Sequence, residues 1–151
     1  MEEANRSIAV KKLLPVTIDP VWKAWTNPDD IAQWWGPKGF TSTIHTMDVK
    51  PGGEWRLTMT GADGKRYLNK SMFIEIIPKE KIIFQHYNPH YAATIVFTPR
   101  GEETLLNWNM LFETVELFNT VVKVFKADEG LQQNVEKLEA YLKEGNDHFL
   151  K

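Results

Sequence analysis

His86 is the side chain of this sequence that is best suited to acid–base chemistry or to recognition of a polar ligand atom. It ends the alternating series Ile82, Phe84, His86, so it faces the same side of a predicted strand as two large apolar side chains. An imidazole titrates near neutral pH, and it can hydrogen-bond a ligand carbonyl or hydroxyl or transfer a proton. A structural histidine, satisfied by a backbone group at the margin of a sheet, fits the same placement. The pattern leaves these two roles open.

The common catalytic and cofactor-binding patterns are missing from the sequence. There is no cysteine, and none of the three serines stands in a Gly-x-Ser-x-Gly elbow, so we expect no acyl-transfer nucleophile. His86 and His90 are separated by Asn88-Pro89, which is typical of a turn, and no third ligand lies nearby in the sequence. Phosphate-cradling and dinucleotide-binding loops are absent as well. We therefore predict no catalytic residue, no metal site and no cofactor.

Length and charge limit the class of protein. A chain of 151 residues can bury a core of its own, and it shows no internal repeat or linker, so we expect a single domain over residues 1–151. Lysine and arginine number 18 against 20 aspartates and glutamates, and the net charge of −2 does not suggest a nucleic-acid partner. The polar start of the chain lacks the order of a signal peptide, and no apolar run approaches the ~20 residues that span a bilayer. Together with the absence of cysteine, these features favour a soluble, cytoplasmic protein without membrane insertion.

The order of the predicted elements indicates an α+β fold. A strand over Ser7–Leu14, stopped by a proline, is typical of a sheet edge. Start signals at Asp19-Pro20 and Asn27-Pro28 predict two short helices, and we expect the second to carry Trp34 and Trp35. Alternation and turn signals then predict consecutive antiparallel strands over 54–60, 67–77, 81–87, 92–98 and 104–113.

A long helix over about 115–144 is predicted to close the chain. Its apolar side chains recur at helical spacing, and this stripe needs a sheet to cover: Val124, Ala127, Leu131, Val135, Leu138 and Leu142. A second stripe runs along the first part of the segment: Phe118, Val122 and Phe125. A helix that is apolar on two sides is either deeply buried or offers a face to a second copy in a homodimer.

The inward face of the predicted sheet carries more bulk than a tightly packed core accommodates easily. Alternation places a series of large apolar side chains on that face: Trp55, Met59, Phe84, Phe97, Trp108 and Met110. Two tryptophans and two flexible thioethers are difficult to interdigitate, and methionine suits adaptable apolar binding surfaces. Each of these side chains is therefore either part of the core or part of a pocket wall.

Three motifs are similar to those of a known family. Trp34-Trp35-Gly36-Pro37 follows the short helices, the segment from Asp48 to Arg56 (DVKPGGEWR) opens the strands, and Gly130-Leu131 lies in the closing helix. Over nearly the whole chain, this series resembles the heat-shock-protein-90 ATPase activator homologue-like family of the START-like (SRPBCC) superfamily. The resemblance implies a helix-grip fold, in which a curved antiparallel sheet wraps around the long C-terminal helix and leaves a cavity. The family pattern has tryptophan after the glycine, where this chain has Leu131, which implies more room at that place.

The resemblance also implies candidate functions. We expect a non-enzymatic, stress-related domain that binds a small hydrophobic or amphipathic ligand between sheet and helix. The candidate cavity lining is Trp35, Trp55, Met59, Phe84, His86, Phe97, Trp108, Met110, Leu131 and Val135. An alternative is a chaperone co-factor that acts on heat-shock protein 90 through its surface. Two-domain eukaryotic activators have an additional domain before the START-like region, and we expect none here. A second alternative is a cyclase- or aromatase-like enzyme with His86 as its base.

Overall fold

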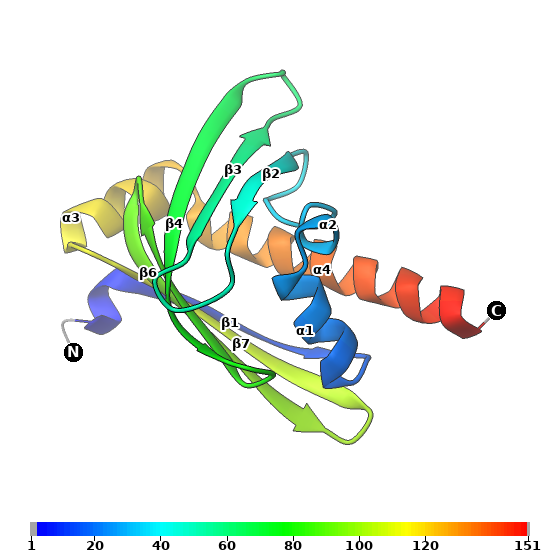
Figure 1. The fold of residues 1–151 in the computed structure, drawn as a ribbon. Coiled ribbons are helices and arrows are strands. Elements are labelled where there is room, and N and C mark those ends of the chain that lie inside the picture. Colours follow the sequence, from blue (N-terminus) through cyan, green and yellow to red (C-terminus); the bar gives the residue numbers. More distant parts are fainter. Residues whose placement is uncertain (1–2, 151) are drawn as a thin grey trace.

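The computed structural model describes residues 3–150 and shows a curved antiparallel sheet with one long helix against it (Figure 1). The strands are β1 (Ser7–Leu14), β2 (Thr41–Met47), β3 (Glu54–Thr60), β4 (Arg66–Ile77), β5 (Lys81–Tyr87), β6 (His90–Arg100) and β7 (Glu103–Phe112). The helices are η1 (Glu3–Arg6), α1 (Ile18–Thr26), α2 (Pro28–Ile31), α3 (Val115–Phe118), the π-helix η2 (Asn119–Val124) and α4 (Ala127–Leu150). The predicted α+β, helix-grip architecture is confirmed, including the two short helices after the first strand.

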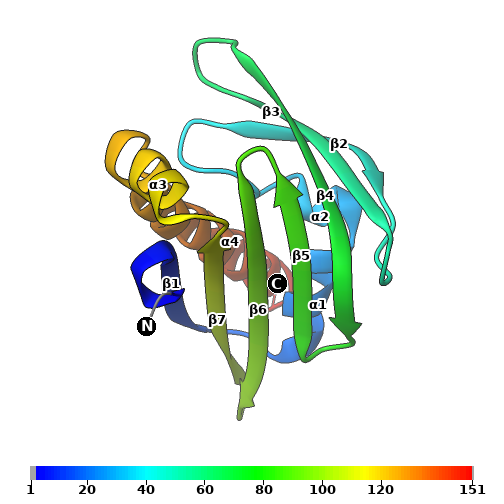
Figure 2. The ribbon, with the colours of Figure 1, turned by 90° about the vertical axis from the view of Figure 1, so that its left-hand side faces the viewer.

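The strands of the described chain form a seven-stranded sheet in the order β1-β7-β6-β5-β4-β3-β2. From β2 to β7, neighbours in the sheet are consecutive in the sequence and antiparallel. β1 instead pairs with β7, from Ser7 opposite Leu111 to Leu14 opposite Thr104, and is an edge strand as predicted. In the view of Figure 2, α4 passes behind β7 and β6, on the face of the sheet that carries the core.

α2 begins at a well-defined cap and is short. The side-chain oxygen of Asn27 accepts hydrogen bonds from the backbone N–H groups of Asp29 and Asp30, at 2.9 and 3.3 Å, so the first turn is capped. The helix is only four residues long. Trp34 and Trp35 therefore lie in the turn that follows α2 and not on the helix, which corrects the prediction for this segment.

The predicted single helix over 115–144 is wrong in its first part. The chain forms α3 and then the π-helical turn η2, and Lys126, with a φ of 56°, adopts the left-handed conformation before α4 begins. Val121 and Val122 have stiff, branched side chains that disfavour a regular helix. As a result, Val124 and Phe125 are 66% and 73% exposed and do not cover the sheet. The stripe of α4 that is buried consists of Leu131, Val135, Leu138 and Leu142.

Four tryptophans fill the interior where α1 and the turn after α2 meet the sheet. We call Trp25, Trp34, Trp35 and Trp108 the tryptophan cluster. Trp25 lies at its centre, with ring centroids 4.9 Å from Trp34 and 4.8 Å from Trp108, both in edge-to-face geometry. The indole N–H of Trp34 donates to the carbonyl of Ala24 at 3.0 Å. This part of the interior is therefore solid.

Candidate functional site

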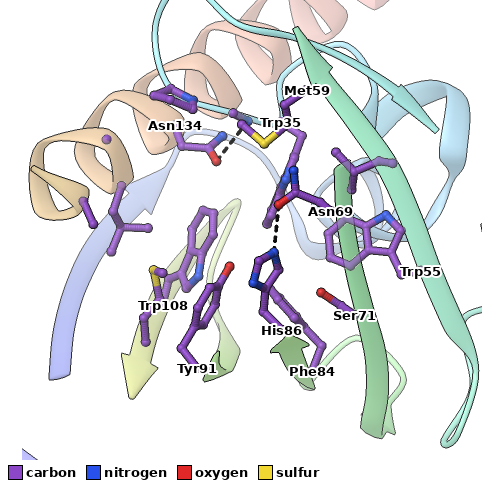
Figure 3. A pocket seen from close by; sticks show the side chains of 17 residues that line it. Trp35, Trp55, Met59, Asn69, Ser71, Phe84, His86, Tyr91, Trp108 and Asn134 are labelled. Atoms are coloured by element: carbon purple, nitrogen blue, oxygen red, sulfur yellow. Dashed lines mark hydrogen bonds between the residues drawn. The ribbon is translucent and has the colours of Figure 1, made fainter. Parts of the chain in front are cut away.

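A cavity of about 180 Å³ lies between the inner face of the sheet and the first turns of α4 (Figure 3). Strands β3 to β7 contribute its walls, together with the turn after α2 and the start of α4. Its lining comprises Trp35, Gly36, Pro37, Trp55, Leu57, Met59, Asn69, Ser71, Phe84, His86, Tyr91, Trp108, Met110, Ala127, Gly130, Leu131 and Asn134. The tryptophan cluster borders the cavity through two of its members, so the interior is filled on one side and hollow on the other.

The structure brings most of the candidate residues to this cavity and leaves two of them elsewhere. The lining includes Trp35, Trp55, Met59, Phe84, His86, Trp108, Met110 and Leu131. Phe97 instead packs on Trp22 and Trp25, with ring centroids 5.7 and 5.9 Å apart. Val135 is fully buried in the core of the protein. Both side chains face inward, but an inward direction is not sufficient to line the cavity, because part of the interior is solid.

Strand register assembles a row of polar side chains in the cavity wall. Ser71 on β4 lies opposite His86 on β5, and His86 lies opposite Tyr91 on β6. Residues that lie opposite each other in antiparallel strands point to the same face of the sheet. Asn69 lies two residues before Ser71 on β4 and also lines the cavity. We call Asn69, Ser71, His86 and Tyr91 the polar row; Figure 3 shows them around the same part of the cavity.

His86 has a hydrogen-bond partner at each ring nitrogen. Its Nδ1 lies 2.8 Å from the carbonyl oxygen of Pro89, and its Nε2 lies 2.8 Å from Oδ1 of Asn69. Both partners are oxygens that only accept, so the neutral ring, which has a single N–H, donates to one of them at a time. Burial lowers the pKa of His86; the hydrogen bond to Pro89 opposes this effect, and the charge of His90 adds to it. The neutral form is thus favoured, and a role as general base would require Asn69 to release Nε2.

Tyr91 stabilises the position of the His86 ring and places a hydroxyl beside it. The two rings are stacked, with centroids 4.7 Å apart and planes inclined by 17°. Phe84 and Phe112 contact Tyr91 from the sides, with centroids 6.1 and 5.6 Å away. Burial raises the pKa of the Tyr91 hydroxyl, so this group stays neutral and can both donate and accept a hydrogen bond.

Asn134 bridges α4 to the turn that carries the tryptophans. Its Oδ1 accepts from the backbone N–H of Gly36 at 3.1 Å, and its Nδ2 donates to the carbonyl of Trp34 at 2.9 Å. One turn along α4, Lys137 donates from Nζ to the carbonyl of Phe40 at 3.0 Å. Gly36 has a φ of 106°, a conformation that other residues rarely adopt. These contacts hold the turn against α4, and both segments contribute to the wall of the cavity.

Full charges are absent from the cavity wall. Its lining residues, all within the described part of the chain, include no lysine, arginine, aspartate or glutamate. The titratable groups that remain are His86 and Tyr91, whose neutral forms are favoured by burial. The wall is therefore apolar or neutral throughout.

Two indole N–H groups of lining residues, those of Trp55 and Trp108, lack a partner among the described residues. The N–H of Trp25, which does not line the cavity, also lacks one. Unpaired indoles are therefore not specific to the cavity, and the polar row is the better marker of its polar side.

Sequence reasoning missed four polar residues of the lining: Asn69, Ser71, Tyr91 and Asn134. In the first part of β4 the usual polarity of the two faces is reversed, since Asn69 and Ser71 face inward whereas Leu68, on the opposite face, is 81% exposed. The inward series that ends at His86 continues across the turn to Tyr91, and Asn134 interrupts the apolar stripe of α4. The positions of Tyr91 and Asn134 could therefore have been inferred from the sequence. The inward direction of Asn69 and Ser71 could not.

A cavity between a curved antiparallel sheet and a C-terminal helix defines the helix-grip, START-like class of domains. The family model of the Activator of Hsp90 ATPase homolog 1-like protein matches residues 15–143. The chain therefore belongs to this family, which is part of the START-like (SRPBCC) superfamily. No curated protein matches the chain.

Solved structures share this fold at low sequence identity. A protein from Nitrosomonas europaea superposes with a TM-score of 0.86 at 22% identity, over 95% of this chain and 98% of that one. A protein from Arthrobacter aurescens gives 0.88 at 22% identity, over 95% and 90%. The AHSA1-like protein from Aeromonas hydrophila gives 0.77 at 19% identity, over 93% and 94%. At such identities, the similarity concerns the fold alone.

Two further properties of residues 3–150 bear on the kind of site. No helix in this range is both long and apolar enough to cross a bilayer. The same range contains no group of three or more histidine, cysteine, aspartate or glutamate side chains that could hold a metal ion.

Proposed function

We propose that this protein binds a small, mainly apolar ligand, about the size of one substituted ring, in the cavity between the sheet and α4. The observation that carries this proposal is the cavity of about 180 Å³ with its largely aromatic and aliphatic wall. Pockets for drug-sized molecules measure ~300–1,000 Å³, whereas an apolar cavity of ~150 Å³ accommodates benzene. We place this function in a single START-like domain over residues 1–151 that acts in the cytoplasm.

Two properties of the wall support ligand binding. Trp35, Trp55 and Trp108 offer broad aromatic surface, and removal of apolar surface from water contributes roughly 25 cal/mol per Å². The Asn134 bridge holds the turn and the helix in place before a ligand arrives, which reduces the entropic cost of binding.

A titration with toluene, followed by calorimetry and by tryptophan fluorescence, tests this function. Leu131→Trp places a large ring in the cavity, and we expect it to weaken binding at least ~10-fold, equivalent to about 1.4 kcal/mol. Leu68→Trp is the matched control, because it adds the same ring at an exposed position outside the lining and should leave binding unchanged. Failure of the wild type to bind toluene, or equal binding by Leu131→Trp, would contradict the proposal.

Membership in the family favours a second candidate, a co-factor that stimulates heat-shock protein 90 through its outer surface. The ATPase rate of the chaperone, measured with the wild type and with Leu131→Trp, separates the two functions. If Leu131→Trp stimulates the ATPase as strongly as the wild type does, the result supports the surface role. An unchanged ATPase rate with the wild type contradicts it.

A further inference from the structure

The polar side chains of the cavity wall differ in whether they have a hydrogen-bond partner. His86 has one at each ring nitrogen, and Asn69 and Asn134 each use both their amide oxygen and their amide nitrogen. The hydroxyls of Ser71 and Tyr91 form no hydrogen bond with any residue of the described range 3–150. Because the indole N–H groups of the wall are themselves buried, these two hydroxyls are the unpaired polar groups that a ligand can reach.

The hydroxyl of Tyr91 is held in a fixed position inside the cavity. Its ring stacks on His86, with centroids 4.7 Å apart, and packs between Phe84 and Phe112. In Figure 3 its oxygen points into the space between the sheet and α4. The Ser71 hydroxyl lies closer to the sheet, because a single carbon joins it to the backbone. A buried polar group without a partner costs free energy, so a ligand atom that pairs with the Tyr91 hydroxyl is favoured.

We propose that the ligand carries a neutral hydrogen-bond acceptor, the oxygen of a ketone, an aldehyde or an amide, which accepts from the hydroxyl of Tyr91. This inference rests on the function proposed above and narrows its ligand class. A phenol is a stronger hydrogen-bond donor than an alcohol and a weaker acceptor, because its ring withdraws electron density from the oxygen. A carbonyl oxygen only accepts, so it complements a phenol that donates.

The uncharged wall favours a neutral carbonyl over a carboxylate. Both groups accept from a hydroxyl, but a carboxylate would be buried without a cation, because no lysine or arginine of the described chain lines the cavity. Burial favours the neutral form of His86, so this ring supplies no positive charge at neutral pH. A carboxylate would therefore lose hydration that the wall does not replace.

Three compounds of nearly the same shape test the inference at pH 7.5: acetophenone, benzoate and α-methylstyrene, in which a methylene group replaces the carbonyl oxygen. Calorimetry gives the ratio of the Kd of α-methylstyrene to that of acetophenone. The hydrocarbon leaves water more readily, so the informative quantity is the change of this ratio between the wild type and Tyr91→Phe. We expect the ratio to fall roughly 5- to 10-fold in the variant, as for the loss of about one net hydrogen bond. Benzoate should bind the wild type more weakly than acetophenone does.

Tyr87→Phe is the matched control, since it removes a tyrosine hydroxyl from the neighbouring strand β5, outside the cavity lining, and should leave the ratio unchanged. If both neutral compounds bind and the ratio changes by less than about twofold in Tyr91→Phe, the inference is overturned and the proposed function stands. Absence of binding by both neutral compounds overturns the two together. Benzoate that binds as tightly as acetophenone also overturns the inference, because the site would then not require a neutral acceptor.

Infrared spectroscopy gives a second reading that does not depend on the folding of a variant. A hydrogen bond weakens the carbonyl bond of acetophenone and lowers its stretching frequency. When acetophenone labelled at its carbonyl carbon is bound to the wild type, this frequency should lie below its value in hexane, and in Tyr91→Phe it should return toward that value. A frequency in the wild type equal to that in hexane overturns the inference.

Discussion

The two ends of the sheet's inner face differ, although the same strands contribute to both. At one end the tryptophan cluster and Phe97 fill the space, with ring centroids 4.8 Å apart for Trp25 and Trp108 and 5.9 Å apart for Trp25 and Phe97. At the other end the polar row leaves a cavity of about 180 Å³. Alternation along a strand sets the face on which a side chain lies, whereas volume and polarity at each position set whether that face is packed or hollow.

The polar row helps to explain why the second end stays hollow. A buried polar group needs a hydrogen-bond partner, so an apolar ring that covered the hydroxyl of Tyr91 would cost free energy. At the solid end the rings instead contact each other edge to face. The difference can be tested by substitutions at each end.

Trp34→Ala at the solid end should have the largest effect. Trp34 is fully buried and donates to the carbonyl of Ala24, so we expect a loss of about 3–5 kcal/mol in the free energy of unfolding, measured in urea. Ser71→Ala at the hollow end removes one oxygen beside the cavity and should cost less than ~1 kcal/mol. Equal losses for the two variants would show that the ends are packed alike.

Asn134→Ala, between the two ends, should rank second. It leaves the N–H of Gly36 and the carbonyl of Trp34 buried without partners, at a cost of about 2–4 kcal/mol in unfolding free energy. The neighbouring Gln133→Ala removes one exposed hydrogen bond to the N–H of Lys38 and should cost under ~1 kcal/mol. If Asn134→Ala were as mild as this control, the bridge would not hold the turn.

The pH dependence of stability should show a smaller effect at the hollow end. The pKa of His86 is lowered in the folded state, so the unfolded chain takes up a proton more readily as the pH falls below about 6.5. Stability is therefore highest above this pH and declines below it. Urea midpoints at pH 7.5 and 5.5 should differ less in His86→Gln than in the wild type. An identical pH dependence in His86→Gln would contradict this assignment.

Gly130→Ala should have the smallest effect, and a favourable one. An added Cβ would meet Cβ of Pro37 at 3.6 Å, an ordinary contact, so the variant should gain about 0.5–1 kcal/mol from its lower unfolded-state entropy. Thermal unfolding measures this gain. Gly53→Ala is the contrasting case, because its Cβ would lie 1.9 Å from the carbonyl oxygen of Asp48. If Gly130→Ala were destabilising, the space between Gly130 and Pro37 would be too small for a methyl group, contrary to the distance of 3.6 Å.

Much of the fold could be predicted because its signals are local. β1 and β5 have the predicted limits, since alternation and flanking turn residues act over a few positions. Apolar spacing alone did not reveal the break at Lys126, because the spacing continues through it while the backbone does not. The spacing also gave no sign that Val124 would be exposed.

Local patterns were sufficient to indicate the family and the inward direction of Trp108 and Met110. The meeting of Ser71, His86 and Tyr91 depends instead on the register of three strands, which the turns and the pairing of the whole sheet establish. The exclusion of Phe97 from the cavity depends on the tryptophans that α1 and the following turn bring against it. Such long-range contacts decide which inward side chains pack together and which remain free to meet a ligand.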